Sequence, residues 1–226
     1  MSGDSTTVAA ERVPRHTCEV KESADLRRRV RSATAPPSSR FPRHHQEDGI
    51  GDPHFGDNPG VFYLDLFRAL SAAQVRYVLV GGLALNLHGI ERATMDVDVA
   101  LALDDENLRR AVEAMQALGM RPIAPIGWDE VLRPGQLARW YDEKHMLALG
   151  LRKEQGLAPT VDILTRLSVP FETLLANSEV KDLAGVRVPL ASIDDLIALK
   201  TGTGRAIDAS DIEALRLLQR MRGTAP

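Results

Sequence analysis

The chain has 226 residues, with 28 basic and 31 acidic side chains and a formal net charge of −3. This length holds one domain with a tail or two small domains, and we expect about one globular domain. The slight negative charge argues against broad non-specific nucleic-acid binding, which usually needs a basic face, although it leaves room for a local site that receives an RNA end.

The first 58 residues differ from the rest because they are polar, charged and poor in apolar side chains. They include an arginine run at 27–29 and a Pro-Pro-Ser-Ser run at 36–39. Such a sequence cannot bury enough apolar surface to offset the entropy lost on ordering. We therefore predict a disordered tail over residues 1–58 and a folded domain with C-terminal helices over residues 59–226, although a start site assigned too far upstream would give the same pattern.

Cysteine usage and hydropathy indicate where the protein works. The one cysteine, Cys18, excludes an intramolecular disulfide framework and a thiolate metal cluster, and it favours a reducing compartment. The N-terminus lacks the apolar core of a signal peptide, and no later run approaches the roughly eighteen apolar residues of a membrane-spanning helix. We therefore predict a soluble, cytoplasmic protein with no membrane partner.

The folded part begins with a predicted helix, a strand and a pair of glycines. Residues 61–74 repeat apolar side chains at helical spacing, and residues 77–80 form an apolar run that suits a buried strand. Gly81 and Gly82 stop this strand and let the backbone approach a ligand closely. Residues 83–88 favour a short helix whose free N–H groups would point at an anion above the glycines. A plain turn is the alternative interpretation.

Residues 95–101 alternate polar and apolar side chains, which predicts a strand. Asp96 and Asp98 then share one face, while Val97 and Val99 point into the core. Two carboxylates about 7 Å apart along one strand repel each other unless a cation lies between them. Mg²⁺ prefers carboxylate and phosphate oxygens, and two such ions activate an attacking oxygen and stabilise a leaving one. This pattern predicts nucleotidyl transfer.

A third carboxylate, Asp162, lies in a similar strand over residues 160–164. A lone Asp-x-Asp pair arises by chance about once in a chain this acidic, so the upstream glycines and the third strand make the pattern more specific. If the strands are neighbours, Asp162 projects toward Asp96 and Asp98. The alternatives are a solvent-exposed strand face for the pair and a loop-edge carboxylate for Asp162.

The rest of the chain predicts further elements around these segments. We expect helices over 104–118, 170–176 and 192–201, strands over 120–123 and 145–151, and a hairpin over 180–188 that turns at 184–185. Ser192 and Ser210 begin capping-box patterns, so the last helix is predicted to start at Ser210. The predicted fold class is α+β, with a small mixed sheet, helices on its outer face and a helical C-terminal portion.

Aromatic and basic residues are further candidates. Trp128, Trp140 and Tyr141 suit either base stacking or packing, and packing is the commoner role. His88 is expected to be a satisfied histidine rather than a ligand. A basic region, if it borders the carboxylates, is the best candidate for docking an RNA acceptor; its residues are Arg133, Arg139, Lys144, Arg152 and Lys153.

These motifs resemble the DNA polymerase β-like nucleotidyltransferase superfamily, and within it the chain is most similar to the AbiEii-type toxin nucleotidyltransferases and their uncharacterised relatives. Gly-Gly and Arg-x-Thr stand where the minimal antitoxin type has Gly-Ser and a Ser before Asp-x-Asp, which favours the toxin-like branch. The resemblance covers about residues 61–222. It is carried by Gly81-Gly82-Leu83-Ala84-Leu85, Arg92-x-Thr94-x-Asp96-x-Asp98, Lys200, Gly204-Arg205 and Asp208-x-x-Asp211.

The resemblance implies roles for these residues. Asp96, Asp98 and Asp162 would be catalytic and would hold the metal, with Asp162 as a ligand or as the base on the acceptor hydroxyl. The implied nucleotide-binding residues are Gly81, Gly82, Arg92, Thr94 and Lys200. Turn termination for Arg92 and Thr94, and a solvated helix lysine for Lys200, are the alternatives.

The implied reaction transfers a nucleoside monophosphate from an NTP to an acceptor hydroxyl and releases pyrophosphate. It uses Mg²⁺, with two ions expected and Mn²⁺ as a substitute. AbiEii-type toxins suggest a tRNA 3′ end as acceptor and an antitoxin protein as partner. The alternative within this chemistry is an aminoglycoside-like adenylyltransferase that acts on a small molecule or a protein. The alternative of another class is a non-catalytic module that binds a nucleotide or a partner.

Overall fold

The computed structural model describes residues 59–154 and 158–223, so the disordered tail predicted over residues 1–58 lies outside the described residues. The described residues all belong to one compact unit. Among their helices, none combines the length and the apolar character that crossing a membrane requires.

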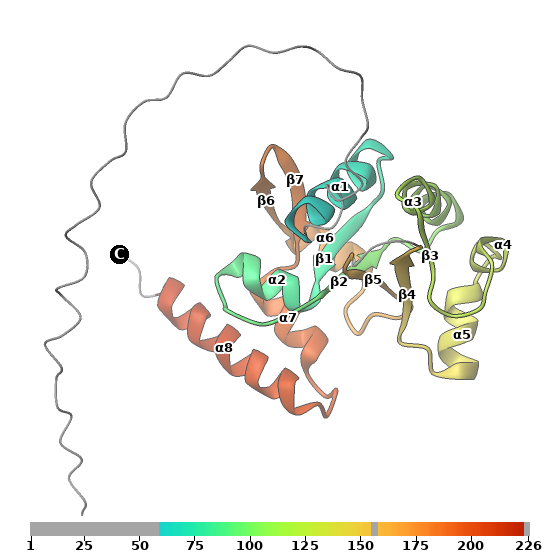
Figure 1. The fold of residues 1–226 in the computed structure, drawn as a ribbon. Coiled ribbons are helices and arrows are strands. Elements are labelled where there is room, and N and C mark those ends of the chain that lie inside the picture. The colour runs from blue at the N-terminus through green and yellow to red at the C-terminus, as the bar shows by residue number, and fades with distance from the viewer. Residues whose placement is uncertain (1–58, 155–157, 224–226) are drawn as a thin grey trace, which may run out of the picture. The chain divides into compact units, whose positions relative to one another are not determined.

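A seven-stranded mixed sheet lies at the centre of this unit, with the strand order β3-β4-β5-β2-β1-β7-β6 (Figure 1). β2 pairs antiparallel with β1 and parallel with β5, and β4 runs antiparallel to β5. β2 therefore lies between the strand that leads to the glycine pair and the strand that carries Asp162. The strands are Tyr77–Val80 (β1), Asp96–Leu101 (β2), Met120–Pro122 (β3), Ala148–Lys153 (β4), Thr160–Leu164 (β5), Glu179–Leu183 (β6) and Val186–Leu190 (β7).

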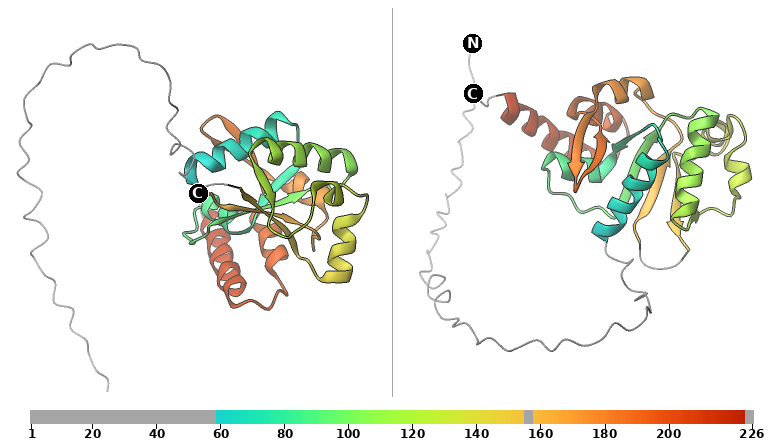
Figure 2. Two further views of the ribbon diagram at one scale, coloured as in Figure 1. Left: turned by 45° about the vertical axis from the view of Figure 1, so that its right-hand side comes forward. Right: turned by 90° about the horizontal axis from the view of Figure 1, so that it is seen from above.

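Helices cover both faces of the sheet. Figure 2 shows α1 and α3 along one side and the C-terminal α7 and α8 on the other. The mixed sheet, its helices and the helical C-terminal portion confirm the predicted fold class. The helices are Pro59–Ala72 (α1), Gly81–His88 (α2), Asp105–Ala117 (α3), Trp128–Val131 (α4), Gln136–Lys144 (α5), Phe171–Asn177 (α6), Ile193–Lys200 (α7) and Ala206–Gly223 (α8).

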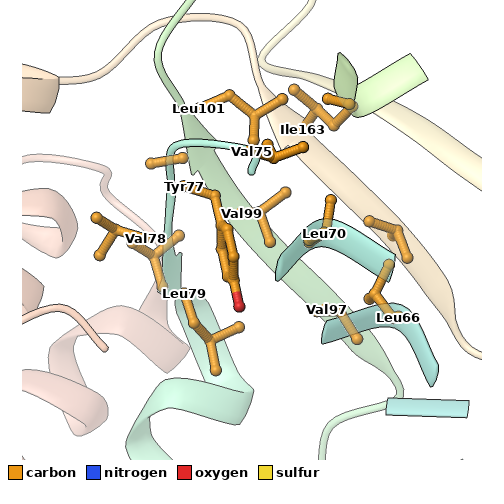
Figure 3. Close-up of a cluster of buried hydrophobic side chains, with 14 of the residues drawn as sticks. Leu66, Leu70, Val75, Tyr77, Val78, Leu79, Val97, Val99, Leu101 and Ile163 are labelled. Atoms are coloured by element: carbon orange, nitrogen blue, oxygen red, sulfur yellow. The ribbon is translucent and has the colours of Figure 1, made fainter. Parts of the chain in front are cut away.

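Strand alternation separates the hydrophobic core from the polar face of the sheet. Val97 and Val99 are fully buried and lie beside Leu66 and Leu70 of α1 (Figure 3). Burying one such aliphatic side chain stabilises the fold by about 1.5–3 kcal/mol, so this face holds the strands and α1 together. The alternate residues of β2, which begin with Asp96, face the other way.

Most of the predicted elements occur where the sequence indicates them. The strands over 77–80 and 160–164 are confirmed, and so is the hairpin turn at 184–185, where both residues have positive φ. Ser192 caps α7 as predicted, because its hydroxyl accepts a hydrogen bond from the Asp195 N–H at 3.1 Å.

The predicted start of the last helix is wrong, because α8 begins at Ala206 and contains Ser210. Asp208 explains the earlier start. Its carboxylate accepts hydrogen bonds from Thr203 and Arg205, which fixes the chain one turn before Ser210. The Ser210 hydroxyl instead donates to the carbonyl of Ala206 inside the helix.

α5 was not predicted, and it moves the start of the next strand. Leu137 and Trp140 are the buried residues of this helix, and two positions are too few to show helical periodicity. The helix ends at His145, which has a left-handed backbone with φ +52°. β4 consequently starts at Ala148 instead of His145.

Candidate active site

The register of β2 and β5 places two carboxylates opposite each other. In this parallel pair Asp98 is the partner of Asp162, and Asp96 is the partner of Thr160. Neighbouring strands lie about 4.8 Å apart, and paired residues project to the same face. The Thr160 hydroxyl donates a hydrogen bond to Asp96. The structure thus confirms that the three aspartates gather on one face of the sheet.

The two glycines form the first turn of α2 rather than a separate turn before it. Gly81 has φ +68°, and a Cβ at this position would lie 1.8 Å from Oδ2 of Asp98. The N–H of Gly82 donates to the Asp98 carboxylate. A Cβ on Gly82 would lie 2.1 Å from Nη1 of Arg92 and 2.8 Å from Oγ1 of Thr94. Because Gly81 and Gly82 have no side chains, the side chains of Asp98, Arg92 and Thr94 can reach the start of α2.

A buried ion-pair network connects α7, α8 and the segment before β2. Lys200 is 7% exposed, and its ammonium donates to Asp208 at 2.9 Å and to Asp211 at 2.7 Å. Asp211 also accepts a hydrogen bond from Nε of Arg92 at 3.1 Å. Asp211 thus binds both Arg92 and Lys200, the two cationic side chains that were predicted to bind the nucleotide.

The environment of the aspartates shifts their proton affinities. Burial raises the pKa of Asp98; the Gly82 N–H opposes this shift and the charge of Asp96 adds to it. Burial also raises the pKa of Asp162 to about 6, and the charges of Asp98 and Asp96 contribute. A carboxyl group with this pKa exchanges protons near neutral pH, as a general base must.

Asp208 shows the opposite shift. Burial by itself would raise its pKa, but hydrogen bonds from Thr203, Lys200 and Arg205 outweigh that effect and lower the pKa to about 2. The carboxylate is therefore ionised at neutral pH, where it remains a partner of Lys200.

A cleft of about 820 Å³ opens along this face of the sheet. Its wall on the β1 side includes the start of α2, Lys200 and Arg205, and its wall on the β4 and β5 side includes Tyr141 and Arg166. All the predicted catalytic and nucleotide-binding residues line this cleft: Gly81, Gly82, Arg92, Thr94, Asp96, Asp98, Asp162 and Lys200.

A sequence model of the family described as nucleotidyl transferase AbiEii toxin, type IV toxin–antitoxin system, matches residues 64–203, which is more than half of the chain. The chain belongs to this family. The AbiEii assignment makes the protein a nucleotidyltransferase and agrees with the resemblance seen in its motifs. No curated protein sequence matches it.

Solved structures similar to this AbiEii chain have low identities and TM-scores below 0.5, so the family assignment rests on the sequence match. The lincosamide antibiotic adenylyltransferase LnuA with bound lincomycin is 15% identical, over 70% of this chain and 96% of that chain, at TM-score 0.46. A nucleotidyltransferase-like antigen from Paracoccidioides brasiliensis is 17% identical, over 72% and 76%, at 0.46. A putative nucleotidyltransferase from Thermotoga maritima is 14% identical, over 76% and 99%, at 0.42.

The oxygen donors in the cleft suit a hard divalent cation. In the described part of the chain, no three carboxylate, imidazole or thiolate groups converge closely enough to form a complete metal cage. Mg²⁺ does not need one, because it is usually bound by one or two carboxylates together with substrate phosphates. The opposed Asp98 and Asp162 fit that donor set, and Asp96 lies one pleat further along β2. Metal binding by these three residues stays a prediction.

Arg166 and Thr203 line the cleft of this AbiEii protein but were not singled out from the sequence. Arg166 lies two residues beyond the strand predicted over 160–164, so the strand pattern did not include it. The strand pattern gives no signal for Thr203 either. Its role depends on Asp208, to which its hydroxyl donates at 2.7 Å.

The basic region does not line the cleft, so the condition on which its RNA-docking role was predicted is not met. None of its residues (Arg133, Arg139, Lys144, Arg152 and Lys153) is among the described residues that line the cleft. Lys144 and Lys153 lie instead over the rings of Trp140 and Phe62.

Trp140 is 1% exposed and serves packing, as expected. His88 is satisfied as expected, because its Nε2 donates to the carbonyl of Ala191 at 2.8 Å.

Proposed function

We propose that this AbiEii family member transfers a nucleoside monophosphate from an NTP to the hydroxyl of a tRNA 3′ end and releases pyrophosphate. The observation that carries the proposal is the pairing of Asp98 with Asp162 inside a cleft that the start of α2 and Lys200 also line. This arrangement offers carboxylates to the reacting atoms and positive groups to a triphosphate.

The triphosphate would lie on the β1 side of Asp98. The first turn of α2, Arg92 and Lys200 line this region. A helix N-terminus and two cations stabilise phosphate oxygens, and a lysine acts there as a point charge. Asp211 positions both cations because it accepts a hydrogen bond from each.

Asp162 would accept the proton of the acceptor hydroxyl. The freed oxygen forms a bond to the α-phosphorus, and the bond from that phosphorus to the bridging oxygen breaks, so pyrophosphate leaves with the bridging oxygen. In the metal-free protein Asp162 has a pKa of about 6, so its carboxylate is ionised at neutral pH and can take up a proton. Loss of that proton to solvent restores Asp162 for the next transfer.

Asp96, Asp98 and Asp162 would hold Mg²⁺ together with phosphate oxygens of the NTP. Bound Mg²⁺ supplies positive charge that stabilises the phosphates and the leaving pyrophosphate. The contribution of the chain is to fix the carboxylates. Thr160 donates to Asp96, and the Gly82 N–H donates to Asp98.

The type IV toxin–antitoxin family leads us to propose an antitoxin protein as partner. We also propose that the reaction takes place in the cytoplasm, where both NTPs and tRNA occur.

Incubating the purified protein with labelled NTPs, Mg²⁺ and total RNA tests the proposal. We expect label in RNA of tRNA size and an equal amount of released pyrophosphate. Asp98→Asn removes the charge at the centre of the cleft and should lower the rate by about 100-fold or more. Asp129 is an exposed carboxylate outside the cleft, so Asp129→Asn is the matched control. This variant should label RNA like the wild type.

Three outcomes contradict parts of this proposal. Equal labelling by wild type and Asp98→Asn would exclude the assigned site. Label in a protein or in an added aminoglycoside, with RNA unlabelled, would replace the tRNA by that acceptor. Nucleotide binding by calorimetry without any product would indicate a non-catalytic module.

A further inference from the structure

The cleft has a wall beyond Asp162 that the phosphate chemistry does not use. Tyr141 of α5, Leu147 before β4 and Arg166 after β5 line it. The guanidinium of Arg166 lies over the Tyr141 ring, 4.8 Å from the ring centroid. A guanidinium plane supported by an aromatic ring presents its outer face for stacking by a flat ligand.

Packing of the fold does not account for this pair. The neighbouring Trp140 anchors α5 in the core with 1% exposure, whereas Tyr141 is only half-buried. Arg166 forms an ion pair with Asp142 at 3.3 Å, but both side chains are more than 60% exposed. Exposed pairs of this kind contribute little to stability, so Arg166 is not held over the ring for the sake of the fold.

The geometry of an in-line displacement decides which substrate reaches this wall. The pyrophosphate would leave toward Arg92 and Lys200, so the attacking oxygen must approach the α-phosphorus from the opposite side. In the strand order that opposite side is β5, since β2 separates it from β1. An acceptor whose hydroxyl reaches Asp162 therefore extends along β5 toward Arg166.

We propose that Tyr141 and Arg166 form a subsite that stacks the unpaired terminal base of an RNA acceptor, an inference that rests on the transfer function proposed above. Unpaired bases at RNA ends stack on aromatic rings and on Arg guanidinium planes. Arg166 is the charged side chain among the described residues of this wall. Its positive charge attracts the phosphate next to the base and repels a polycationic aminoglycoside.

Steady-state kinetics of nucleotide transfer to tRNA test the subsite. Tyr141→Leu keeps an apolar side chain but removes the ring, so KM for tRNA should rise about tenfold or more, as the loss of one base stack predicts. KM for the NTP should stay within about twofold of the wild type, because the phosphates bind on the other side of Asp98. Tyr141→Phe keeps the ring and should restore the wild-type KM for tRNA.

Phe171→Leu is the matched control, because Arg76 lies over the Phe171 ring at 5.4 Å and neither residue lines the cleft. This variant should leave both KM values unchanged, and Arg166→Gln should raise KM for tRNA as Tyr141→Leu does. The inference is overturned if Tyr141→Leu raises KM for the NTP alone, or if Tyr141→Leu and Phe171→Leu behave alike. A failure of the transfer function itself is distinguishable, since the wild-type protein would then label no RNA.

Discussion

Gly81 is the position at which the candidate site tolerates a side chain least. Its backbone is left-handed, with φ +68°, and a Cβ would lie 1.8 Å from Oδ2 of Asp98. Two separate restrictions therefore apply. The first is a backbone conformation that L-residues adopt at a cost of about 1–2 kcal/mol, and the second is a clash with a carboxylate proposed to bind the metal.

Gly119 shares the backbone restriction but not the clash, because its φ is +70° and a Cβ there would meet nothing within 4 Å. We predict that Gly81→Ala and Gly119→Ala each lower the free energy of unfolding by about 1–2 kcal/mol or more. Transfer activity should fall about 100-fold in Gly81→Ala alone, since displacing a reacting group by an ångström has an effect of that size. Denaturant titration and the transfer assay measure the two effects, and equal activities of the two variants would contradict the assignment.

At the level of single residues, local pattern was enough to identify the aspartates and the glycines. The alternation around Asp96 and Asp98 and the position of Gly81 after an apolar strand are visible within a few residues. The contact of Asp211 with Arg92 spans 119 residues and depends on how α8 docks, so no local pattern could show it. The sequence placed Asp211 in a motif that carries the family resemblance, but it assigned Asp211 no contact with Arg92.

Buried ion pairs join helices α7 and α8. Lys200 at the end of α7 pairs with Asp208 and Asp211 of α8. Both carboxylates and the ammonium are less than 10% exposed. Removing one partner of a buried ion pair leaves a charge without compensation, and this typically lowers the free energy of unfolding by about 3–5 kcal/mol.

We predict that Asp211→Asn loses about 3–5 kcal/mol of stability and also weakens NTP binding, because Arg92 and Lys200 lose the carboxylate that positions both. Glu213→Gln removes an exposed carboxylate from the same helix and should change stability by less than about 0.5 kcal/mol. Urea unfolding and nucleotide calorimetry provide the two readouts. Normal NTP affinity in a folded Asp211→Asn protein would show that the network is purely structural.

The accuracy of the element predictions followed the strength of their local signals. The strand over 160–164 carries strong apolar alternation and was placed correctly. α5 buries only Leu137 and Trp140, and α8 starts at Ala206 because of side-chain contacts to Asp208, so their positions depend on tertiary packing. The pairing of strands and the order of the sheet are likewise long-range properties that periodicity does not contain.

For the whole molecule, the gathering of aspartates on one sheet face opposes stability. In the metal-free protein, Asp162 has a pKa of about 6, compared with 3.8 for an unperturbed aspartate. The folded state therefore holds a proton that the unfolded state releases between about pH 4 and pH 6. Stability linked to Asp162 is fully present below this range and is lost as the pH rises through 6.

We predict that Asp162→Asn, measured without metal, melts at a higher temperature than the wild type above pH 6. The difference should shrink as the pH falls toward 4, because the wild-type carboxyl becomes neutral there. Adding Mg²⁺ with an NTP should raise the melting temperature of the wild type more than that of the variant. Thermal unfolding across this pH range measures the effect, and a difference that does not depend on pH would refute it.

The parallel pairing of β2 with β5 also determines when the site first exists in a growing chain. Ribosomes add about 5–20 residues per second, and domains fold as their segments emerge. Gly81 and Asp98 are therefore made seconds before Asp162, and Lys200 and Asp211 follow later still. A partly made chain lacks the opposing carboxylate and the buried lysine. An enzyme proposed to modify tRNA, which its own synthesis uses, would thus have a complete site only after Asp162, Lys200 and Asp211 have all been added.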